Sequence, residues 1–345
     1  MTRRRTIPPG LVSLLIVGVA FGGLLVYVVV RTDSNWALFF QLTVNGLTLG
    51  SVYALIALGY SMVYGILKLL NFAHGDVYMI GAFIGLGVLT ALGGPANPSV
   101  PLLPLLLAMF LVAMLGSGFL GVLIERVAYR PLRDAPRIAP LISALGVSFF
   151  LQNSMLLLFG AQFRTYDPFT LFADPITGLV PTWTIGSVTI SIMRIIAIAA
   201  AVALMVVLTL FVARTQLGKA MRATSYDREA ASMMGIDTDR VIAWTFFIGS
   251  ALAGAAGVMF GLVFSQIFHF MGFLAGLKGF TAAVVGGIGS IPGAMLGGLL
   301  VGLTEAYATG YVSGNWSDLV VFSLLIIVLL VRPTGLLGSR AIQKV

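Results

Sequence analysis

The stretch NGLTLGSVYALIALGYSMVYGILKLLNFAHGDVYMIGAF, residues 45–83, contains two apolar runs separated by the short polar segment NFAHGD. The first run extends over Ala37–Leu67, well beyond the about 20 apolar residues that a helix needs to cross a bilayer. The second run begins at Val77. Apolar runs of this length, joined by so few polar residues, are typical of helices that span a membrane.

The composition of the whole chain supports this interpretation. Of the 345 residues, 59% are hydrophobic and 9% are charged, whereas an ordinary soluble domain has roughly 25% charged residues. The mean hydropathy is +1.04. These values exclude a soluble enzyme and a disordered chain. The chain has no Cys and 2 His, which excludes a disulfide scaffold, a thiolate zinc site and a cysteine nucleophile.

Apolar segments recur along the entire chain, and ten of them are candidates for membrane spans. The second is too long for one straight helix, and the eighth is too short to span unless it begins near Gly276. We therefore predict an all-α polytopic membrane protein with about ten transmembrane segments, some of them broken or short. The candidate segments are Gly10–Val30, Ala37–Leu67, Val77–Leu92, Val100–Ile124, Ile138–Phe159, Ile190–Ala213, Ala243–Phe264, Phe280–Ile288, Ala294–Tyr311 and Leu319–Val331.

The basic residues predict the orientation in the membrane. If the N-terminus lies inside and the segments alternate, all of the 20 basic residues except Arg31, Arg164, Arg194 and Lys278 fall in inside loops. This distribution follows the positive-inside rule and predicts that both ends lie inside. The net charge of +8 is therefore explained by topology. Because no stripe of basic residues with interleaved aromatics occurs, we expect no nucleic-acid partner.

Three regions outside the main helices stand apart. Residues 1–36 are predicted to form an extra N-terminal anchor helix, because Arg3–Arg5 precede an apolar run longer than a usual signal-peptide core. No A-x-A site follows before Arg31, although a cleaved signal peptide is the alternative. Residues 161–189 are predicted to form a small periplasmic loop, and residues 214–242, the most densely charged part of the chain, a cytoplasmic loop.

The polar segment NFAHGD contains three candidate functional residues, Asn71, His74 and Asp76. Polar side chains inside a membrane protein mark functional sites by default, so these residues are candidates for a substrate path. A local explanation is equally open, in which Asp76 caps the following helix and Asn71 closes the preceding one. Glu305 also lies within an apolar run, either paired with a buried partner or facing an aqueous path.

A second break lies in residues 276–298, which contain eight of the 41 glycines. Small residues let helices pack closely, and we expect this role for most of them, including the pairs Gly46/Gly50 and Gly293/Gly297. The cluster GGIGSIPG is denser than packing requires. Transporters place such non-helical backbone beside their substrate path. The candidate path residues of this break are Gly286, Gly287, Gly289 and Ser290.

The chain carries no catalytic or nucleotide-binding motif, so we expect it not to be an enzyme. The nearest match to a phosphate-binding loop is LGKAM, residues 217–221, which lacks both the upstream glycine loop and the hydroxyl after the lysine. Energy for any active transport must then come from another subunit or from an ion gradient.

The segment GKAMRATSYDREAASMMGID, residues 218–237, predicts a short amphipathic helix on the inside. At helical spacing, Ala230, Met233 and Met234 form one small face with charged residues beside it. This composition fits docking in a protein groove. The alternative, a helix lying on lipid, usually combines a basic polar face with bulkier apolar residues.

Several stretches of the sequence resemble a known protein family. The sequence Glu229-Ala230-Ala231, followed by Gly235, resembles the E-A-A-x-x-x-G loop of ABC importer permeases. Residues 45–83 resemble the N-terminal signature of LivH-type branched-chain amino acid permeases, and the resemblance covers residues 37–345. Further matching stretches are IERVAYRPLR (124–133), SALGVSFFLQN (143–153), MGIDTDRVIAWTFFIGSALAGAAGVMFG (234–261), FTAAVVGGIGSIPGAMLGGLLVGLTEA (280–306) and VLLVRPTGLLG (328–338).

Two departures from the family pattern are visible. Residues 1–36 look like an addition to the family core, and Asp76 stands where the family often has Glu, which keeps the charge with a shorter side chain.

The resemblance implies that residues 37–345 are the transmembrane domain of an ABC importer in the inner membrane. It implies a LivM-like second permease, two cytoplasmic ABC ATPase subunits that hold ATP-Mg, a periplasmic amino-acid-binding protein, and membrane lipid as surroundings. No cofactor is then bound by this chain itself. The implied solutes are leucine, isoleucine and valine, and the polar residues of both breaks are candidates to solvate the zwitterion. The residues implied in coupling to the ATPase are Arg222, Asp227, Glu229, Ala230, Ala231 and Gly235.

Several alternatives stay open. Related permeases transport urea, short amides or other amino acids, and no residue here indicates a pocket specific for leucine. An ion-coupled secondary transporter is a second class, although only Asp76 and Glu305 could form its relay. A structural or assembly protein without a substrate path is a third class, against which the polar break and the coupling-like segment argue.

Overall fold

The computed structural model describes residues 35–133, 135–136, 138–174, 177 and 179–338, and these residues are mostly helical. The anchor helix predicted at Gly10–Val30 lies outside the described residues. The helices are α2 (Trp36–Leu67), α3 (His74–Ala91), α4 (Leu102–Ile124), α5 (Ile138–Phe159), α6 (Pro168–Leu171), α7 (Ile192–Arg214), α8 (Gln216–Tyr226), α9 (Arg228–Met233), α10 (Thr238–Phe264), α11 (Met271–Gly286), α12 (Ile291–Tyr307) and α13 (Ser317–Val331).

Strands and tight helical turns make up the rest of the regular structure. The strands are β1 (Arg164–Thr165), β2 (Thr182–Ile185), β3 (Val188–Ser191) and β4 (Gln266–Ile267), with β1 antiparallel to β4 and β2 antiparallel to β3. Two π-helical turns, Glu125–Tyr129 and Ala308–Val312, follow α4 and α12 directly, and two 3-10 turns occupy Arg130–Leu132 and Gly314–Trp316.

Among the described residues, 8 helices are long and apolar enough to cross a membrane, and α11 is a shorter apolar helix. These nine helices correspond one for one to the nine segments predicted after residue 36. The fold class, an all-α polytopic membrane protein, is therefore confirmed.

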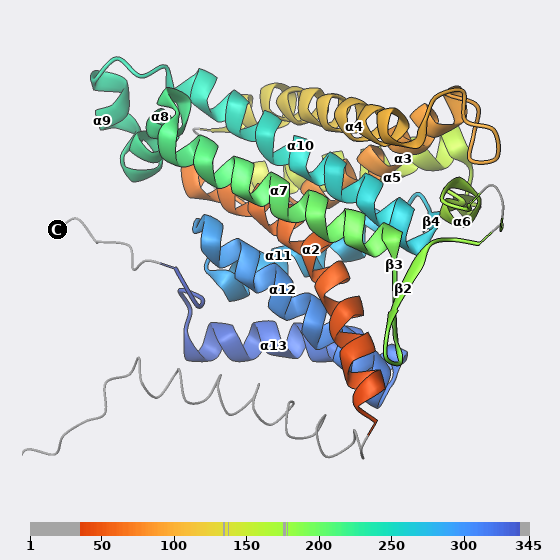
Figure 1. Cartoon of the computed structure of the whole chain (residues 1–345). Helices are drawn as coiled ribbons and strands as arrows, with labels where there is room; N and C mark the ends of the chain where they lie inside the picture. Colours follow the sequence, from red (N-terminus) through yellow and green to blue (C-terminus); the bar gives the residue numbers. More distant parts are fainter. Residues whose placement is uncertain (1–34, 134, 137, 175–176, 178, 339–345) are drawn as a thin grey trace, which may run out of the picture.

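The two segments of unusual length have simple explanations. Helix α2 is one continuous helix of 32 residues, longer than a straight span of the bilayer needs. At about 1.5 Å per residue it measures about 48 Å, and it lies obliquely to the other long helices (Figure 1). A tilted helix accommodates this excess length. Helix α11 begins at Met271, before Gly276, and has 16 residues.

The long helices connect two ends of the molecule, which Figure 1 shows at its left and right. We call them the α8–α9 end and the hairpin end, the latter after β2 and β3. The ends of α2 and α7 and the beginnings of α10 and α12 meet at the α8–α9 end. The ends of α5 and α10 meet at the hairpin end through the pairing of β1 with β4. The chain thus alternates as the sequence predicts.

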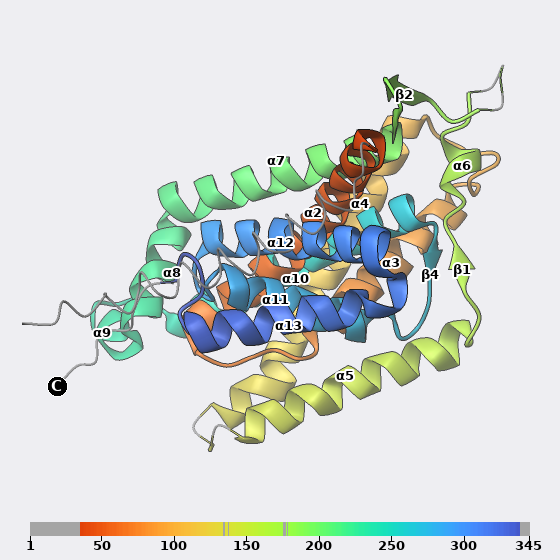
Figure 2. The same ribbon diagram turned by 90° about the horizontal axis from the view of Figure 1, so that it is seen from below.

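Helices α2 and α10 form the core, since about four fifths of the apolar window of each is buried, at 78%. Helices α5 and α7 lie on opposite sides of this core (Figure 2). Together with α13 they are the least buried spans, which suits contact with lipid or with a second subunit.

Glycine permits the closest approach in the core, between α2 and α12. A methyl group at Gly302 would lie 2.2 Å from the backbone nitrogen of Gly50, and one at Gly46 would lie 2.8 Å from the Cα of Leu303. A methyl group at Gly297 would lie 2.0 Å from the carbonyl oxygen of Ala282 on α11. The predicted packing role of the G-x-x-x-G pairs is therefore confirmed.

Candidate functional site

The three polar residues of the first break are buried at the beginning of α3, where each is 1–2% exposed. Asn71 precedes the helix, and its side-chain oxygen accepts a hydrogen bond of 3.1 Å from the hydroxyl of Tyr129. The Tyr129 hydroxyl also lies 3.3 Å from the carbonyl oxygen of Leu70. Tyr129 belongs to the π-helical turn after α4, so this turn anchors the break against its neighbour helix.

Asp76 lies in the first turn of α3, and its carboxylate faces α5. The hydroxyl of Ser148 donates to one oxygen, and the amide of Gln152 donates to the other at 3.0 Å. Both donors are neutral, and no cation among the described residues forms an ion pair with Asp76. The negative charge is thus solvated by hydrogen bonds and by the N-terminal end of the α3 dipole.

The imidazole of His74 packs edge-on against Tyr60, with ring centroids 4.8 Å apart. Neither ring nitrogen makes a hydrogen bond of normal geometry with the described residues. Glycine at position 59 makes room for the ring, because a methyl group there would lie 2.2 Å from His74 Nε2. His74 is therefore a buried polar side chain with hydrogen-bonding capacity left over.

The local explanation of the first break is wrong in both parts. The N-cap of α3 is Ala73, which makes no side-chain capping bond, and the oxygens of Asp76 bind α5 instead. Helix α2 ends at Lys68 in the left-handed conformation, with its backbone N–H bonded to the carbonyl of Tyr64. Asn71 takes no part in that cap. These side chains are therefore directed to other helices, a choice that local spacing does not reveal.

The second break is a tight connection between α11 and α12 whose amides are already bonded. The amide of Gly287 donates to Ala283, that of Gly289 to the hydroxyl of Ser61 at 3.2 Å, and that of Ser290 to Gly287. Gly287 and Gly289 have φ values of 113° and 88°, which favour glycine. The three amides are therefore bonded within the chain, by acceptors in the turn and in α2, although Gly289 itself is exposed.

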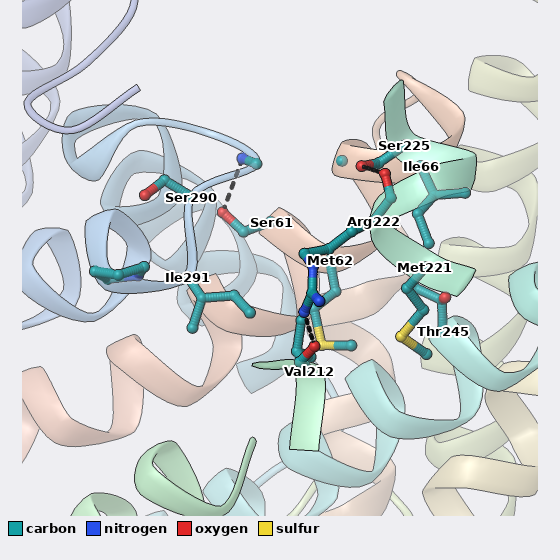
Figure 3. A pocket seen from close by; sticks show the side chains of 13 residues that line it. Ser61, Met62, Ile66, Val212, Met221, Arg222, Ser225, Thr245, Ser290 and Ile291 are labelled. Carbon is teal, nitrogen blue, oxygen red and sulfur yellow. Dashed lines mark hydrogen bonds between the residues drawn. The ribbon is translucent and has the colours of Figure 1, made fainter. Parts of the chain in front are cut away.

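A cavity of about 260 Å³ lies beside the second break at the α8–α9 end (Figure 3). Ser290 and Arg222 line it together, although the sequence assigns them different roles. Asn71, His74 and Asp76 are not among its lining residues, so the two breaks do not share this cavity. The lining residues are Ser61, Met62, Gly65, Ile66, Val212, Met221, Arg222, Ser225, Thr245, Gly289, Ser290, Ile291 and Pro292.

Arg222 is held within the chain. Its guanidinium donates to the carbonyl oxygen of Val212 (Figure 3) and to that of Ala213, both in the last turn of α7. A cation at this position satisfies carbonyls that have no partner in the helix and complements its dipole. Arg222 therefore fastens α8 to α7, while its predicted part in coupling stays a prediction.

The predicted coupling segment forms two helices, α8 and α9, rather than one. Asp227 is extended between them and caps α9, accepting a bond of 3.1 Å from the amide of Ala230. Ala231 is buried, whereas Glu229 and Ala230 are exposed. Gly235 follows the helix with a φ of 84°.

The small face of this segment points away from the protein. Met233 and Met234 are 86% and 82% exposed, an unusual state for such apolar side chains. Together with Ala230, which is also exposed, they form an apolar knob on α9. Figure 1 shows α9 at one end of the molecule.

Glu305 has a buried partner, one of the two alternatives that the sequence left open, but the sequence did not identify the ionic cluster to which it belongs. Lys278, predicted in an outside loop, lies in α11 and is 8% exposed, so that placement is wrong. Its ammonium group lies 2.8 Å from Glu305 of α12 and 2.6 Å from Asp318 of α13. Tyr53 of α2 donates to Glu305 at 2.9 Å. The signal was available in part, since Lys278 and Glu305 have opposite charge within apolar segments.

Comparison of the sequence with known proteins identifies its family. The model of the family described as "branched-chain amino acid transport system / permease component" matches residues 42–329. The chain is 47% identical over 307 residues to the high-affinity branched-chain amino acid transport system permease protein BraD of Pseudomonas aeruginosa, covering 89% of this chain and 98% of BraD.

Two further relatives come from Escherichia coli K12. The permease protein LivH is 46% identical over 312 residues, with 89% of this chain and 98% of LivH covered. The permease protein LivM is 28% identical over 327 residues, with 86% of this chain and 70% of LivM covered. These relatives and the 8 candidate spans identify a multi-pass protein of the inner membrane. The chain belongs to the family of branched-chain amino acid transport system permease components.

Proposed function

We propose that this chain is a permease subunit of a binding-protein-dependent ABC importer that carries leucine, isoleucine and valine. A LivM-like permease forms the pore with it, two ATPase subunits supply the energy, and a periplasmic binding protein delivers the solute. The observation that carries the proposal is the similarity to BraD and LivH over 98% of their length. The weaker similarity to LivM favours a pore made from two related chains.

The first break supplies polar groups for the solute in this proposal. The ammonium group of an amino acid needs a negative partner, and Asp76 has a carboxylate with neutral neighbours only. His74 and Asn71, two and five residues before Asp76 along the chain, add further polar groups. The glycines of the second break serve the tight α11–α12 turn. The adjoining cavity of about 260 Å³ is slightly smaller than the about 300–1,000 Å³ of drug-sized ligand pockets, which suits a small solute.

The knob of Ala230, Met233 and Met234 is the coupling surface in this proposal. Exposed methionines adapt to a groove on a partner protein. Glu229 and Gly235 flank the knob, and Arg222 ties α8 to α7, so a displacement of the knob by the ATPase is passed to a membrane-spanning helix.

ATP-dependent uptake in proteoliposomes tests the proposal. The chain is co-expressed with candidate permease and ATPase partners, the binding protein is added, and labelled leucine is offered beside labelled urea. We expect leucine uptake that requires both ATP and this chain. The variant Met233→Arg should abolish uptake while membrane insertion is retained, and the control Ser232→Arg, on another side of α9, should keep it.

Two other outcomes would support the alternative functions. Urea uptake in place of leucine uptake keeps the architecture and replaces the solute class. Uptake by this chain alone, driven by an ion gradient, overturns the ABC coupling and leaves a secondary transporter.

A further inference from the structure

A groove separate from the sites above lies between α4 and α10 at the α8–α9 end. Its volume is about 910 Å³. The last turns of α4 and the π-helical turn after it form one wall, and the first turns of α10 form the other. One half of the groove is lined by apolar side chains and the other half by charged ones.

The apolar half consists mainly of aromatic rings. Phe247 lies edge-on to both Phe119 and Trp244, with ring centroids 5.5 Å and 5.4 Å apart. A methyl group at Gly118 would lie 2.8 Å from the Phe247 ring, so glycine leaves room for this arrangement. Phe119 and Trp244 are 66% and 45% exposed. Large apolar residues exposed on a membrane-spanning helix face lipid, and Trp favours the interface with water.

The charged half is lined by three arginines and three carboxylates, and two further arginines outside the lining pair with these carboxylates. Asp239 is paired with Arg130 at 2.7 Å and with Arg133, and Arg133 also binds Glu125. Asp237 caps α10 and lies 3.7 Å from the side chain of Arg240.

Arg228 approaches Asp239 to 3.6 Å from α9. Arg126 lines the groove, is exposed, and makes no ion pair with any residue that the structure describes. The described side chains of this cluster therefore carry five positive and three negative charges, a net charge of +2. The positive members are Arg126, Arg130, Arg133, Arg228 and Arg240, and the negative ones Glu125, Asp237 and Asp239.

We infer that the α4–α10 groove binds one anionic phospholipid. Its phosphate lies between Arg126, which has no ion pair among the described residues, and Arg240, whose one ion pair is the 3.7 Å contact with Asp237. An acyl chain runs along Phe119, Trp244 and Phe247. The juxtaposition of a net positive mouth with an aromatic channel open to the bilayer matches the two parts of such a lipid. Basic grooves between membrane-spanning helices bind anionic headgroups by this chemistry.

Quenching of Trp244 fluorescence by brominated lipids tests the inference. The full chain, with Trp36, Trp183 and Trp316 replaced by Phe, is reconstituted in liposomes. Phosphatidylglycerol or phosphatidylcholine with brominated acyl chains is then added at equal mole fraction. We expect phosphatidylglycerol to quench Trp244 with an apparent affinity at least about fivefold higher, the preference that one basic residue near the surface contributes.

Matched variants separate a built site from general attraction to negative lipid. The variant Arg126→Gln/Arg240→Gln should remove the preference. The control Arg214→Gln/Lys219→Gln removes the same charge from exposed positions of the same end, outside the groove, and should retain it. Equal quenching by both lipids, equal loss in both double variants, or protection of Trp244 by a co-reconstituted second permease overturns the inference.

Discussion

The interior of this protein contains two groups of buried polar side chains that neutralise charge in different ways. Lys278 lies between the carboxylate of Glu305 and the half-exposed carboxylate of Asp318, and so joins α11, α12 and α13. Asp76, at the beginning of α3, receives hydrogen bonds from the neutral side chains of Ser148 and Gln152. The first group is an ion cluster, whereas the second holds a carboxylate without a cation.

This difference separates a structural role from a functional one. A buried cation between two anions is strongly held, and removing it leaves uncompensated charge. A carboxylate with only neutral donors keeps its negative charge, which can form a charge-assisted hydrogen bond with a positively charged group of a solute. We therefore propose a stabilising role for the Lys278 cluster and solute contact for the Asp76 cluster, and the following variants test that proposal.

The largest effect on stability is expected for Lys278→Met. It leaves Glu305 buried without its cation and should lower the free energy of unfolding by roughly 3–5 kcal/mol. Unfolding in mixed micelles of SDS and a mild detergent measures this change. The exposed Lys219→Met is the control and should change stability by less than about 0.5 kcal/mol. If Lys278→Met is equally mild, or if adding Glu305→Gln recovers nothing, the ion cluster is not what joins α11–α13.

Gly59→Ala should have the next largest effect. The new methyl group would lie 2.2 Å from His74 Nε2, and overpacking of this kind costs about 1–3 kcal/mol. Because the contact is with the imidazole, His74→Ala in the same chain should recover much of the loss. Gly87→Ala is the matched control, since nothing lies within 4 Å of a methyl group there. A loss of stability as large in Gly87→Ala would contradict the steric explanation.

Asp76→Asn separates transport from stability. The substitution keeps the shape of the side chain and removes the charge, so the loss of a charge-assisted bond to the solute should raise the KM for leucine about tenfold, or about 1.4 kcal/mol. Thermal unfolding should change little. Glu305→Gln should show the reverse pattern. The partly exposed Asp167→Asn, which keeps an oxygen to cap α6, should show neither effect. An unchanged KM in Asp76→Asn would remove Asp76 from the solute path.

The smallest effect is expected for Tyr129→Phe. This variant removes the hydroxyl that binds Asn71, and a lost hydrogen bond of this kind costs about 0.5–1.5 kcal/mol. Tyr64→Phe is the control, because no hydrogen bond of the Tyr64 hydroxyl occurs among the described residues. Equal stability of the two variants would mean that the Tyr129 bond does not anchor the first break.

Much of the fold follows from local sequence. The nine predicted segments after residue 36 all appear as helices, because length and hydrophobicity decide which segments enter a membrane. The same local pattern identifies Asn71, His74 and Asp76 as candidate functional residues, and the structure shows that they are buried. It does not identify their partners, since Tyr129 and Ser148 are 58 and 72 residues away along the chain.

Some expectations failed for an identifiable reason. The positive-inside pattern assigns Lys278 to the outside. It does not reveal that Lys278 is buried, because the two carboxylates that allow its burial lie on other helices. The sequence does not show that the Gly289 amide is bonded, because its acceptor, the hydroxyl of Ser61, lies 228 residues away along the chain. The predicted coupling helix is divided by Asp227, whose extended backbone and side-chain cap begin α9.

The sequence by itself determined the number and order of the membrane helices after residue 36, the positions of both breaks and the resemblance to a permease family. These properties depend on hydrophobicity and on residues that are neighbours in the chain. Only the tertiary structure decided that α2 is one oblique helix, that Lys278 is ion-paired and that Asp76 has neutral partners. The physical reason is that burial of a polar group is tolerated according to what other helices bring within hydrogen-bonding distance.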